Sequence, residues 1–141
     1  MRLLPLVFCF GLLLSSCKKE ETPAQRLQQT RWMLAQVESF PIGLSSYSES
    51  YRTYVQFDVD NTTNGLGPCN SFTGTYTLGS SAGQLTINQQ IATQLACPVQ
   101  ELETRYLNAL ARTASFKITN NKLQLYEAGA TEPHLQFTAA D

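Results

Sequence analysis

The sequence predicts a mainly β protein of the α+β class, in which a small, strongly curved antiparallel sheet, or a small barrel, packs with one α-helix. Two patterns predict this fold class. Several short segments alternate apolar and polar residues and are separated by turns rich in glycine and asparagine, which is typical of half-buried antiparallel strands. One longer segment repeats apolar residues at three- and four-residue steps, which is typical of a helix that packs one face on a core.

The expected strands are short, and turns or loops separate them. They cover residues 32–37, 53–59, 72–78, 84–87, 91–95, 115–118, 123–126 and 134–137. The expected loops and turns cover residues 39–51, 61–67, 79–83 and 120–121. In the second strand, Val55, Phe57 and Val59 fall on one face, because successive side chains of a strand point to opposite sides. The two asparagines at 120–121 favour a hairpin turn.

The one strong helix is expected to begin at Pro98, because proline is favoured at the first helical position, where its missing N–H costs nothing. Glu101 and Glu103 lie in or near the first turn, where the helix dipole favours anions. Glu101 and Arg105 have the spacing of an ion pair along a helix. The apolar stripe consists of Val99, Leu102, Tyr106, Leu107 and Leu110. Residues 24–29, directly after a proline, predict a further helical turn or two.

Residues 1–16 predict a signal peptide. Arg2 precedes an apolar run over residues 3–14, which as a helix measures about 18 Å, whereas the hydrocarbon core of a bilayer measures about 30 Å. The run is therefore too short for a permanent span and has the length of a signal-peptide core. It ends in Leu-Ser-Ser-Cys, which resembles the lipobox of bacterial lipoproteins, so we expect a lipid on Cys17 and cleavage before it. An ordinary secretory leader with an incidental cysteine is the alternative.

The chain is therefore expected to have three parts: a signal peptide at 1–16, a lipidated cysteine with a charged tether at 17–26, and one domain at 27–141. The tether begins with Lys-Lys-Glu-Glu, which is typical of a solvated spacer. It also resembles the signal that sends some Gram-negative lipoproteins to the outer face of the outer membrane. We expect a protein of the cell envelope, held to a membrane by its lipid, with the outer membrane as its site and a periplasmic or surface-facing orientation left open.

Composition and motif spacing exclude several function classes. The 141 residues carry a formal net charge of −1, which argues against a nucleic-acid binder. His134 is the single histidine, and we expect it on the surface of the last strand. Residues 60–71 begin like a calcium loop but have Ser71 where the bidentate glutamate belongs. Glu101 and Glu103 face different directions on a helix. With no zinc, phosphate-binding or nucleophile motif, the sequence predicts no metal site, no cofactor and no enzyme activity.

The cysteines predict one covalent bridge. Cys9 leaves with the signal peptide and Cys17 is acylated, so Cys69 and Cys97 remain. An even pair of cysteines in an exported domain predicts a disulfide. Two buried free thiols are the alternative, whereas a nucleophilic cysteine is disfavoured, because the single histidine is far away in the sequence.

Three motifs resemble one known family. Residues 67–76 read GPCNSFTGTY and are similar to the G-x-C-N-x-[FY]-x-G-x-Y core of META domains. Residues 93–98 read TQLACP and resemble that family's T-x-M-A-C-P segment, with Leu95 where methionine is usual. Residues 103–110 match its helix of the form E-x-x-[FY]-L-x-x-L. The chain thus resembles the META/HslJ-like family over residues 27–137. The motif residues are Gly67, Asn70, Phe72, Gly74, Tyr76 and Pro98.

The resemblance implies a small antiparallel β structure with one packed helix, in an envelope protein. It associates HslJ-type members with heat-shock induction and novobiocin resistance and other members with secretion and motility, and it implies no catalytic residues. From their chemistry, Gly67 and Gly74 suit tight turns or close backbone approach, and Asn70 can bond nearby backbone in a turn. Phe72 and Tyr76 are expected to fill a core face. A binding surface at this motif is the alternative to a scaffold role.

Two function classes follow. The first is a non-enzymatic envelope lipoprotein that binds a protein or peptide partner, in an envelope or stress-response role. The second is a carrier of a small apolar ligand in the mouth of a barrel. A filled interior with an exposed apolar patch favours the first class, and an apolar cavity favours the second. Candidate contact residues are Tyr47, Tyr51 and Tyr54, because tyrosine gives broad contact area at low entropic cost. The sequence does not set the oligomeric state.

Overall fold

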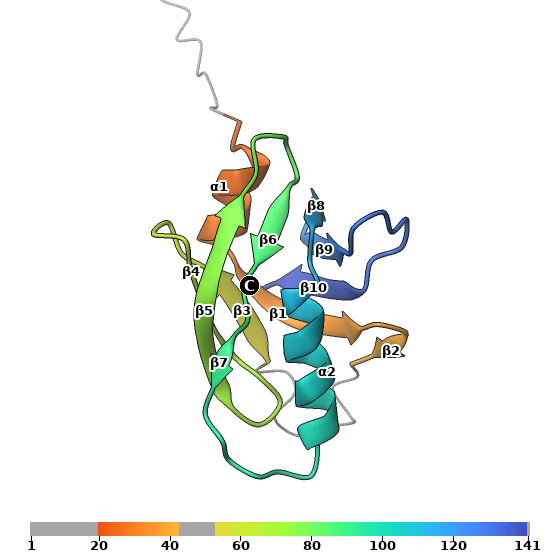
Figure 1. Ribbon diagram of the computed structural model, residues 1–141. Coiled ribbons are helices and arrows are strands. Elements are labelled where there is room, and N and C mark those ends of the chain that lie inside the picture. Colours follow the sequence, from red (N-terminus) through yellow and green to blue (C-terminus); the bar gives the residue numbers. More distant parts are fainter. Residues whose placement is uncertain (1–19, 43–52, 141) are drawn as a thin grey trace, which may run out of the picture.

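The computed structural model describes residues 20–42 and 53–140, which form a mainly antiparallel β structure with two helices (Figure 1). In chain order the elements are α1 (Pro23–Gln29), β1 (Arg31–Val37), β2 (Phe40–Pro41), β3 (Tyr54–Phe57), β4 (Thr62–Leu66), β5 (Ser71–Leu78), β6 (Leu85–Ile87), β7 (Ile91–Ala92), α2 (Gln100–Ala111), β8 (Ser115–Thr119), β9 (Lys122–Tyr126) and β10 (Leu135–Ala139). The predicted fold class, mainly β with a packed helix, is confirmed.

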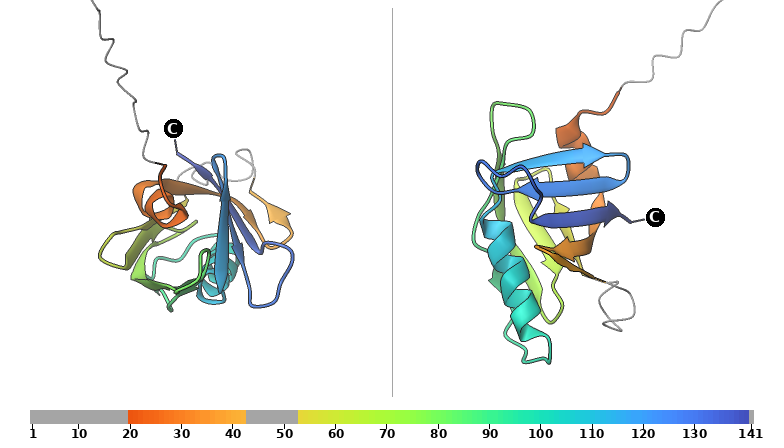
Figure 2. Two further views of the ribbon diagram at one scale, coloured as in Figure 1. Left: turned by 90° about the horizontal axis from the view of Figure 1, so that it is seen from above. Right: turned by 90° about the vertical axis from the view of Figure 1, so that its right-hand side faces the viewer.

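The strands curl into a nearly closed barrel. Their order across the sheet is β6-β5-β4-β3-β1-β10-β9-β8, every pair is antiparallel, and β2 and β7 are short additions to β1 and β5. The two ends of this order meet, because Gln84 forms a bridge with Ser115 and the N–H of Phe116 donates to the carbonyl of Gly83 at 2.8 Å. Figure 2 shows the curled sheet from above.

The core fills the inside of this curled sheet. Eighteen hydrophobic residues are buried in one cluster, to which seven of the strands and both helices contribute. In Figure 1, α1 lies at the upper end of the barrel and adds Leu27, while α2 lies at the lower right and adds Tyr106. Aromatic rings meet edge to face, with centroids 5.2 Å apart for Phe57 and Tyr76 and 5.8 Å apart for Phe72 and Tyr106. The core therefore holds together elements from the whole described chain.

Two expected elements form closely as predicted. Strand β5 buries Phe72 and Tyr76 on one face, and its threonines at positions 73, 75 and 77 are exposed on the other. The hairpin of β8 and β9 turns at Asn120, whose φ of +53° lies in the left-handed region that asparagine tolerates. Local alternation and turn chemistry are thus sufficient for these elements.

Helix α1 extends the folded domain toward the N-terminus. Thr22 caps it, with its hydroxyl accepting the N–H of Gln25 while the Gln25 side chain accepts the N–H of Thr22. Leu27 is fully buried, and the indole N–H of Trp32 donates to its carbonyl at 3.0 Å. The helical turns expected over residues 24–29 are therefore confirmed, and the helix begins one residue earlier, at Pro23.

Strand β4 occupies residues that were expected to form a turn at 61–67, so that prediction is wrong. The glycine that suggested a turn, Gly65, instead fits a crowded place in the sheet. A Cβ there would collide with the ring of Phe72 and the carbonyl oxygen of Tyr54. Glycine is therefore needed for close packing between strands and not for turning.

The tight turn lies earlier, between β3 and β4. The N–H of Asn61 donates to the carbonyl of Asp58 at 3.1 Å, and Asn61 has a φ of +66°. Val59 lies in this turn and is 79% exposed. Its expected place beside Val55 and Phe57 on one strand face is therefore wrong, because β3 ends before it.

The segment before α2 also departs from expectation. The strand expected over residues 91–95 ends after Ala92, because the chain leaves the sheet there to reach the helix. The helix begins at Gln100 and not at Pro98. The N–H of Gln100 donates to the carbonyl of Cys97 at 3.3 Å, which closes a turn over residues 98 and 99.

Strand β2 is a further departure, because it lies inside the loop expected over residues 39–51.

His134 is not the exposed strand residue that was expected. It precedes β10, is 9% exposed, and its Nε2 lies 2.8 Å from the carbonyl of Ala109 at the end of α2. Burial lowers the pKa of the imidazole, because removal from water costs the charged form more free energy than the neutral form. The histidine therefore joins the helix to the barrel as a neutral donor.

Candidate binding site

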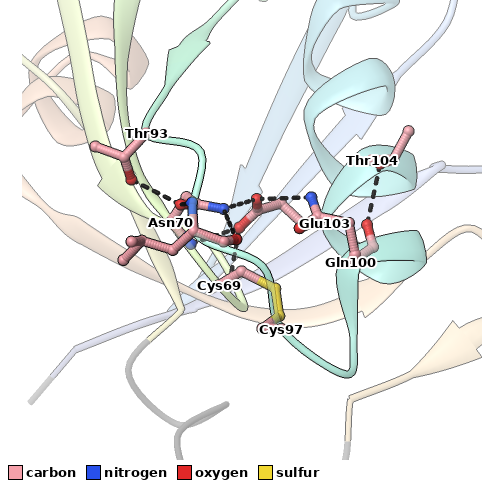
Figure 3. Close-up of a disulfide and its surroundings, with 8 residues drawn as sticks. Cys69, Asn70, Thr93, Cys97, Gln100, Glu103 and Thr104 are labelled. Carbon is pink, nitrogen blue, oxygen red and sulfur yellow. Dashed lines mark hydrogen bonds between the residues drawn. A yellow bond between two sulfur atoms is a disulfide. The ribbon is translucent and has the colours of Figure 1, made fainter.

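Glu103 is a buried carboxylate at the start of α2. It is 2% exposed and accepts four hydrogen bonds (Figure 3). Its Oε2 accepts the backbone N–H groups of Cys69 at 2.8 Å and Asn70 at 2.6 Å. Its Oε1 accepts the amide of Asn70 at 2.6 Å and that of Gln100 at 3.3 Å. All four partners are donors and both carboxyl oxygens accept, so this side chain ties the loop before β5 to α2.

Asn70 connects the same point to the segment that precedes α2. Its Oδ1 accepts the N–H of Leu95 at 2.7 Å and the hydroxyl of Thr93 at 2.8 Å, and its Nδ2 donates to the carbonyl of Leu95 at 3.2 Å. Asn70 thus bonds backbone, as its chemistry suggests, but the backbone groups belong to Leu95 on a distant segment. One side chain links two loops and, through Glu103, the helix.

A disulfide lies beside this network. Cys69 and Cys97 are joined, with their Cα atoms 5.9 Å apart, and the bond is half-buried (Figure 3). Gly67 also lies against the carboxylate, because a Cβ there would come within 2.6 Å of the Oε2 of Glu103. The first motif glycine thus leaves room for a side chain from the helix, which is a close approach of the kind its position predicts.

The remaining motif residues shape the barrel away from this network. A Cβ on Gly74 would collide with the amide of Gln90, which is buried and accepts the hydroxyl of Thr63 at 2.7 Å. The hydroxyl of Tyr76 donates to the carbonyl of Asp58 at 2.7 Å, and burial raises the pKa of Tyr76. Phe72 is buried in the core, as expected. The motif residues therefore have two roles: some hold the first turn of α2 through Glu103, and the others pack within β5.

The segment at residues 91–97, which Asn70 and the disulfide hold, exposes apolar side chains to solvent. Ile91 is 74% exposed and Leu95 is 67% exposed. Between residues 92–96 and α2 lies a surface depression of about 440 Å³, with Leu107 and the buried Glu103 on its helix side. Ile91 and Leu95 do not pack in the core, although hydrogen bonds from β5 and from Asn70 hold their backbone in place.

A second depression, of about 370 Å³, lies on the other side of the same helix. Phe40, Pro41 and Ile42 line it from the β2 side, and Leu102 and Arg105 line it from α2. Phe40 is 52% exposed, and the Arg105 guanidinium lies 5.3 Å from the centroid of its ring. We call these two depressions with Phe40, Ile91 and Leu95 the α2 flank, and it is the candidate binding site.

Ion pairs fix the turn after β1 against the helix. Arg105 pairs with Glu101 at 2.9 Å, which is the i,i+4 pair expected from the sequence, and with Glu38 at 3.7 Å. Arg112 pairs with Glu38 at 3.0 Å and with Glu127 at 2.7 Å. These partly exposed pairs lower the pKa of Glu127 through its hydrogen bond to Arg112. They position β2, and with it Phe40, beside α2.

The polar residues around the turn before β4 and at the start of α2 have local roles. Asp60 accepts the N–H and the hydroxyl of Thr62, which lowers the pKa of the carboxyl and fixes the turn before β4. Within the described residues, no three His, Cys, Asp or Glu side chains come close enough to hold a metal ion. Glu101 is exposed while Glu103 is buried, so the two carboxylates face different directions.

Three of the predicted site residues lie outside the described residues. These are Cys17, Tyr47 and Tyr51, so the lipidation site and most of the tyrosine surface stay predictions. Tyr54 lies in β3, half-buried, with the Arg31 guanidinium 4.4 Å from its ring centroid. None of the helices in the described part of the chain has the length and apolar character needed to span a bilayer.

Comparison with known proteins identifies the fold's relatives. A family model for the META domain matches residues 25–141. A structure determined by NMR is 25% identical, with 86% of this chain and 97% of that chain covered and a TM-score of 0.62. A DUF4847 family protein from Bacteroides vulgatus ATCC 8482, known from a crystal structure, is 14% identical over 79% of this chain and 93% of its own, with a TM-score of 0.58. An NMR structure of a protein from Burkholderia xenovorans is 21% identical over 82% and 85%, with a TM-score of 0.58. The last two show the fold alone. Among curated proteins, none matches the chain.

Proposed function

Because the chain belongs to the META domain family, we propose that it is a lipid-anchored protein of the cell envelope whose META domain works by binding a protein or peptide partner. The anchor is a lipid on Cys17, the membrane is the outer membrane, and the role is one in envelope maintenance or stress response. The partner binds at the α2 flank.

One observation carries the binding proposal. The segment with Ile91 and Leu95 keeps both side chains exposed, although a disulfide and the Asn70–Glu103 network hold its backbone. Exposed apolar side chains on a fixed segment are a feature of partner-binding surfaces, because little conformational entropy is lost when they are covered. The depressions beside them would receive side chains of the partner.

The chemistry of the site supports binding over catalysis. Glu103, which lines one depression of the flank, already accepts four hydrogen bonds, and these use the lone-pair positions of a carboxylate. The two cysteines beside it, Cys69 and Cys97, are joined in a disulfide, so neither carries a thiolate. These groups therefore hold the structure and are not available as a base or a nucleophile.

The filled interior supports partner binding over the carriage of a small apolar ligand. Trp32, Tyr76, Tyr106 and Phe137 occupy the middle of the barrel with the rest of the buried cluster. The depressions found around the described residues lie at the surface beside the helices.

Cell fractionation tests the anchor. Wild-type protein is expected in the membrane fraction with the mass of a lipidated chain that starts at Cys17, and the Cys17→Ala variant in the soluble fraction. A Cys17→Ala variant that stays with the membrane, or an intact leader without lipid mass, would show the anchor to be wrong.

Site-specific photocrosslinking in intact cells tests the binding surface. A photoreactive residue in place of Leu95 is expected to give an adduct of one defined mass. The matched control replaces Thr86, which is exposed on β6, away from the α2 flank. Leu95→Glu should abolish capture at a second photoreactive position, Ile91. The same adducts from Thr86 and from Leu95 would contradict the proposal.

A further inference from the structure

One wall of the barrel carries cations without acidic neighbours on its strands. Strands β8, β9, β10 and β1 stand side by side, and the right-hand view of Figure 2 shows β8, β9 and β10 at the front with no helix over them. Lys117, Lys122 and Arg31 are exposed on β8, β9 and β1. No strand in the described part of the chain contains Asp or Glu. This wall is therefore positive, although the net charge of the chain is −1.

Cross-strand register lines up a row of amides with one of these cations. Lys117 lies opposite Gln124, Gln124 opposite Gln136, and Gln136 opposite Gln36. The residues on both sides of Gln124 and Gln136 along their strands are buried, so these amides point outward. The row crosses four strands, about 14 Å at a strand spacing of about 4.8 Å. The Gln136 amide donates to that of Gln36 at 3.0 Å, which aligns the two side chains.

The remaining cations lie on one side of this row, Lys122 in the next cross-strand row and Arg31 one row beyond it. Lys122 lies between Thr119 and Thr138 in the neighbouring cross-strand row. Arg31 stacks on Tyr54, which orders its guanidinium at the β1 side of the wall. We call the surface formed by Lys117, Gln124, Gln136, Gln36, Lys122 and Arg31 the Lys–Gln face.

The cations near α2 differ from those of the Lys–Gln face. Arg105 and Arg112 are paired with glutamates beside the helix. Among residues 20–42 and 53–140, no ion pair includes Arg31, Lys117 or Lys122. The charge of the Lys–Gln face is therefore not neutralised within the described structure, and it complements an anionic partner.

We propose that the Lys–Gln face binds an anionic polysaccharide. Side-chain amides both donate and accept, which suits the hydroxyl groups of sugars, and the cations suit carboxylate or other anionic substituents. A bilayer surface would be recognised by apolar side chains that insert, and an added peptide strand by an unpaired sheet edge. The Lys–Gln face offers instead the broad side of paired strands. It is separate from the α2 flank, so the proposal does not depend on the protein partner proposed above.

Calorimetric titration of the full-length protein with polygalacturonate, which carries one carboxylate per sugar, tests the proposal. We expect binding that weakens as salt increases. Dextran tests a neutral glycan and polyglutamate an acidic peptide. Phosphatidylglycerol vesicles test an anionic lipid surface and are titrated with the Cys17→Ala variant, because a lipid on Cys17 would itself insert into them. All three should bind more weakly. Amide chemical-shift changes with polygalacturonate should concentrate on β8, β9, β10 and β1, which is a readout on the wild-type protein that no variant's folding affects.

Variants separate recognition from net charge. Lys117→Gln with Lys122→Gln should weaken polygalacturonate binding about five- to tenfold, as for two exposed ion pairs. The matched control, Thr77→Glu with Thr86→Glu, lowers the net charge by the same two units on β5 and β6 and should change the affinity less than about twofold. Gln124→Met with Gln136→Met should weaken polygalacturonate binding and leave that of polyglutamate unchanged.

Four results would overturn the proposal. These are no binding of polygalacturonate, an equal loss in the lysine and threonine variants, an affinity for polyglutamate or vesicles as high as for polygalacturonate, and shift changes that lie on the α2 flank or are spread over the whole barrel.

Discussion

Asn70 and Glu103, 33 positions apart in the chain, hold each other at two points: the Asn70 backbone N–H meets Oε2 and its side-chain amide meets Oε1, each at 2.6 Å. The loop before β5, the segment before α2 and the helix itself all meet at this pair. Loss of either side chain should therefore increase the mobility of the α2 flank more than that of β8, β9 and β10, because these strands do not contact the pair.

Replacing Glu103 with glutamine should destabilise the protein by about 2–3 kcal/mol. One oxygen becomes an amide that opposes donors from Asn70 and Gln100, which leaves buried donors without an acceptor. Urea unfolding with the disulfide intact measures the loss. The matched control is Glu101→Gln, which removes only the exposed pair with Arg105 and should cost about 0.5 kcal/mol or less. Equal losses in both variants would show that the buried hydrogen bonds contribute little.

Removing the disulfide should cost about 3.5 kcal/mol, the loop-closure estimate for cysteines 28 positions apart. The variant is Cys69→Ser with Cys97→Ser, and thermal and urea unfolding measure the change. Because the bridge and Glu103 hold the same loop, the losses from Glu103→Gln and from the serine pair should not add. Additive losses would mean that the two ties act independently.

Gly74→Ala should cost about 1–3 kcal/mol, because the new methyl group meets the buried amide of Gln90. In a Gln90→Ala background the colliding atoms are absent, so the same change should cost much less. A double-mutant cycle of unfolding free energies measures this coupling. A cost for Gly74→Ala that is the same in both backgrounds would place the strain in the backbone of β5 and not at Gln90.

The protein should lose stability as pH falls below about 6.5 through protonation of His134. Burial lowers the pKa of the folded-state imidazole below its ordinary 6.5, so the unfolded chain binds the proton more readily. The contribution is complete above the unfolded pKa and decreases as pH falls toward the folded one. The free energy of unfolding between about pH 7 and pH 5 should fall more steeply for wild type than for His134→Gln. Parallel pH profiles would show that His134 does not titrate between the two states in this range.

Local patterns predict those parts of the fold that local interactions determine. Alternation identifies the buried face of β5, and paired asparagines identify the turn between β8 and β9. Strand β4 escapes prediction, because Gly65 has the composition of a turn and its reason for being glycine is the ring of Phe72 on another strand.

The candidate site is harder to predict, because its contacts join distant segments. A signal for Glu103 exists: positions 99, 103, 106 and 110 follow steps of four, three and four, so the glutamate stands within the apolar stripe and is directed inward. Nothing in the sequence near Asn70 indicates that this carboxylate is its partner. His134 gives no signal either, because its acceptor is a backbone carbonyl on α2.

With the proposed lipid on Cys17, the early start of α1 would keep the barrel close to the membrane. Five residues lie between Cys17 and Pro23, and the six steps that join these two positions span at most about 21 Å when the chain is fully stretched. A molecule anchored at that cysteine would stay close to the membrane, with helix α1 toward the bilayer. Any partner of a molecule anchored in this way would have to come to the membrane surface, and inserting residues before Thr22 would widen its reach without altering the fold.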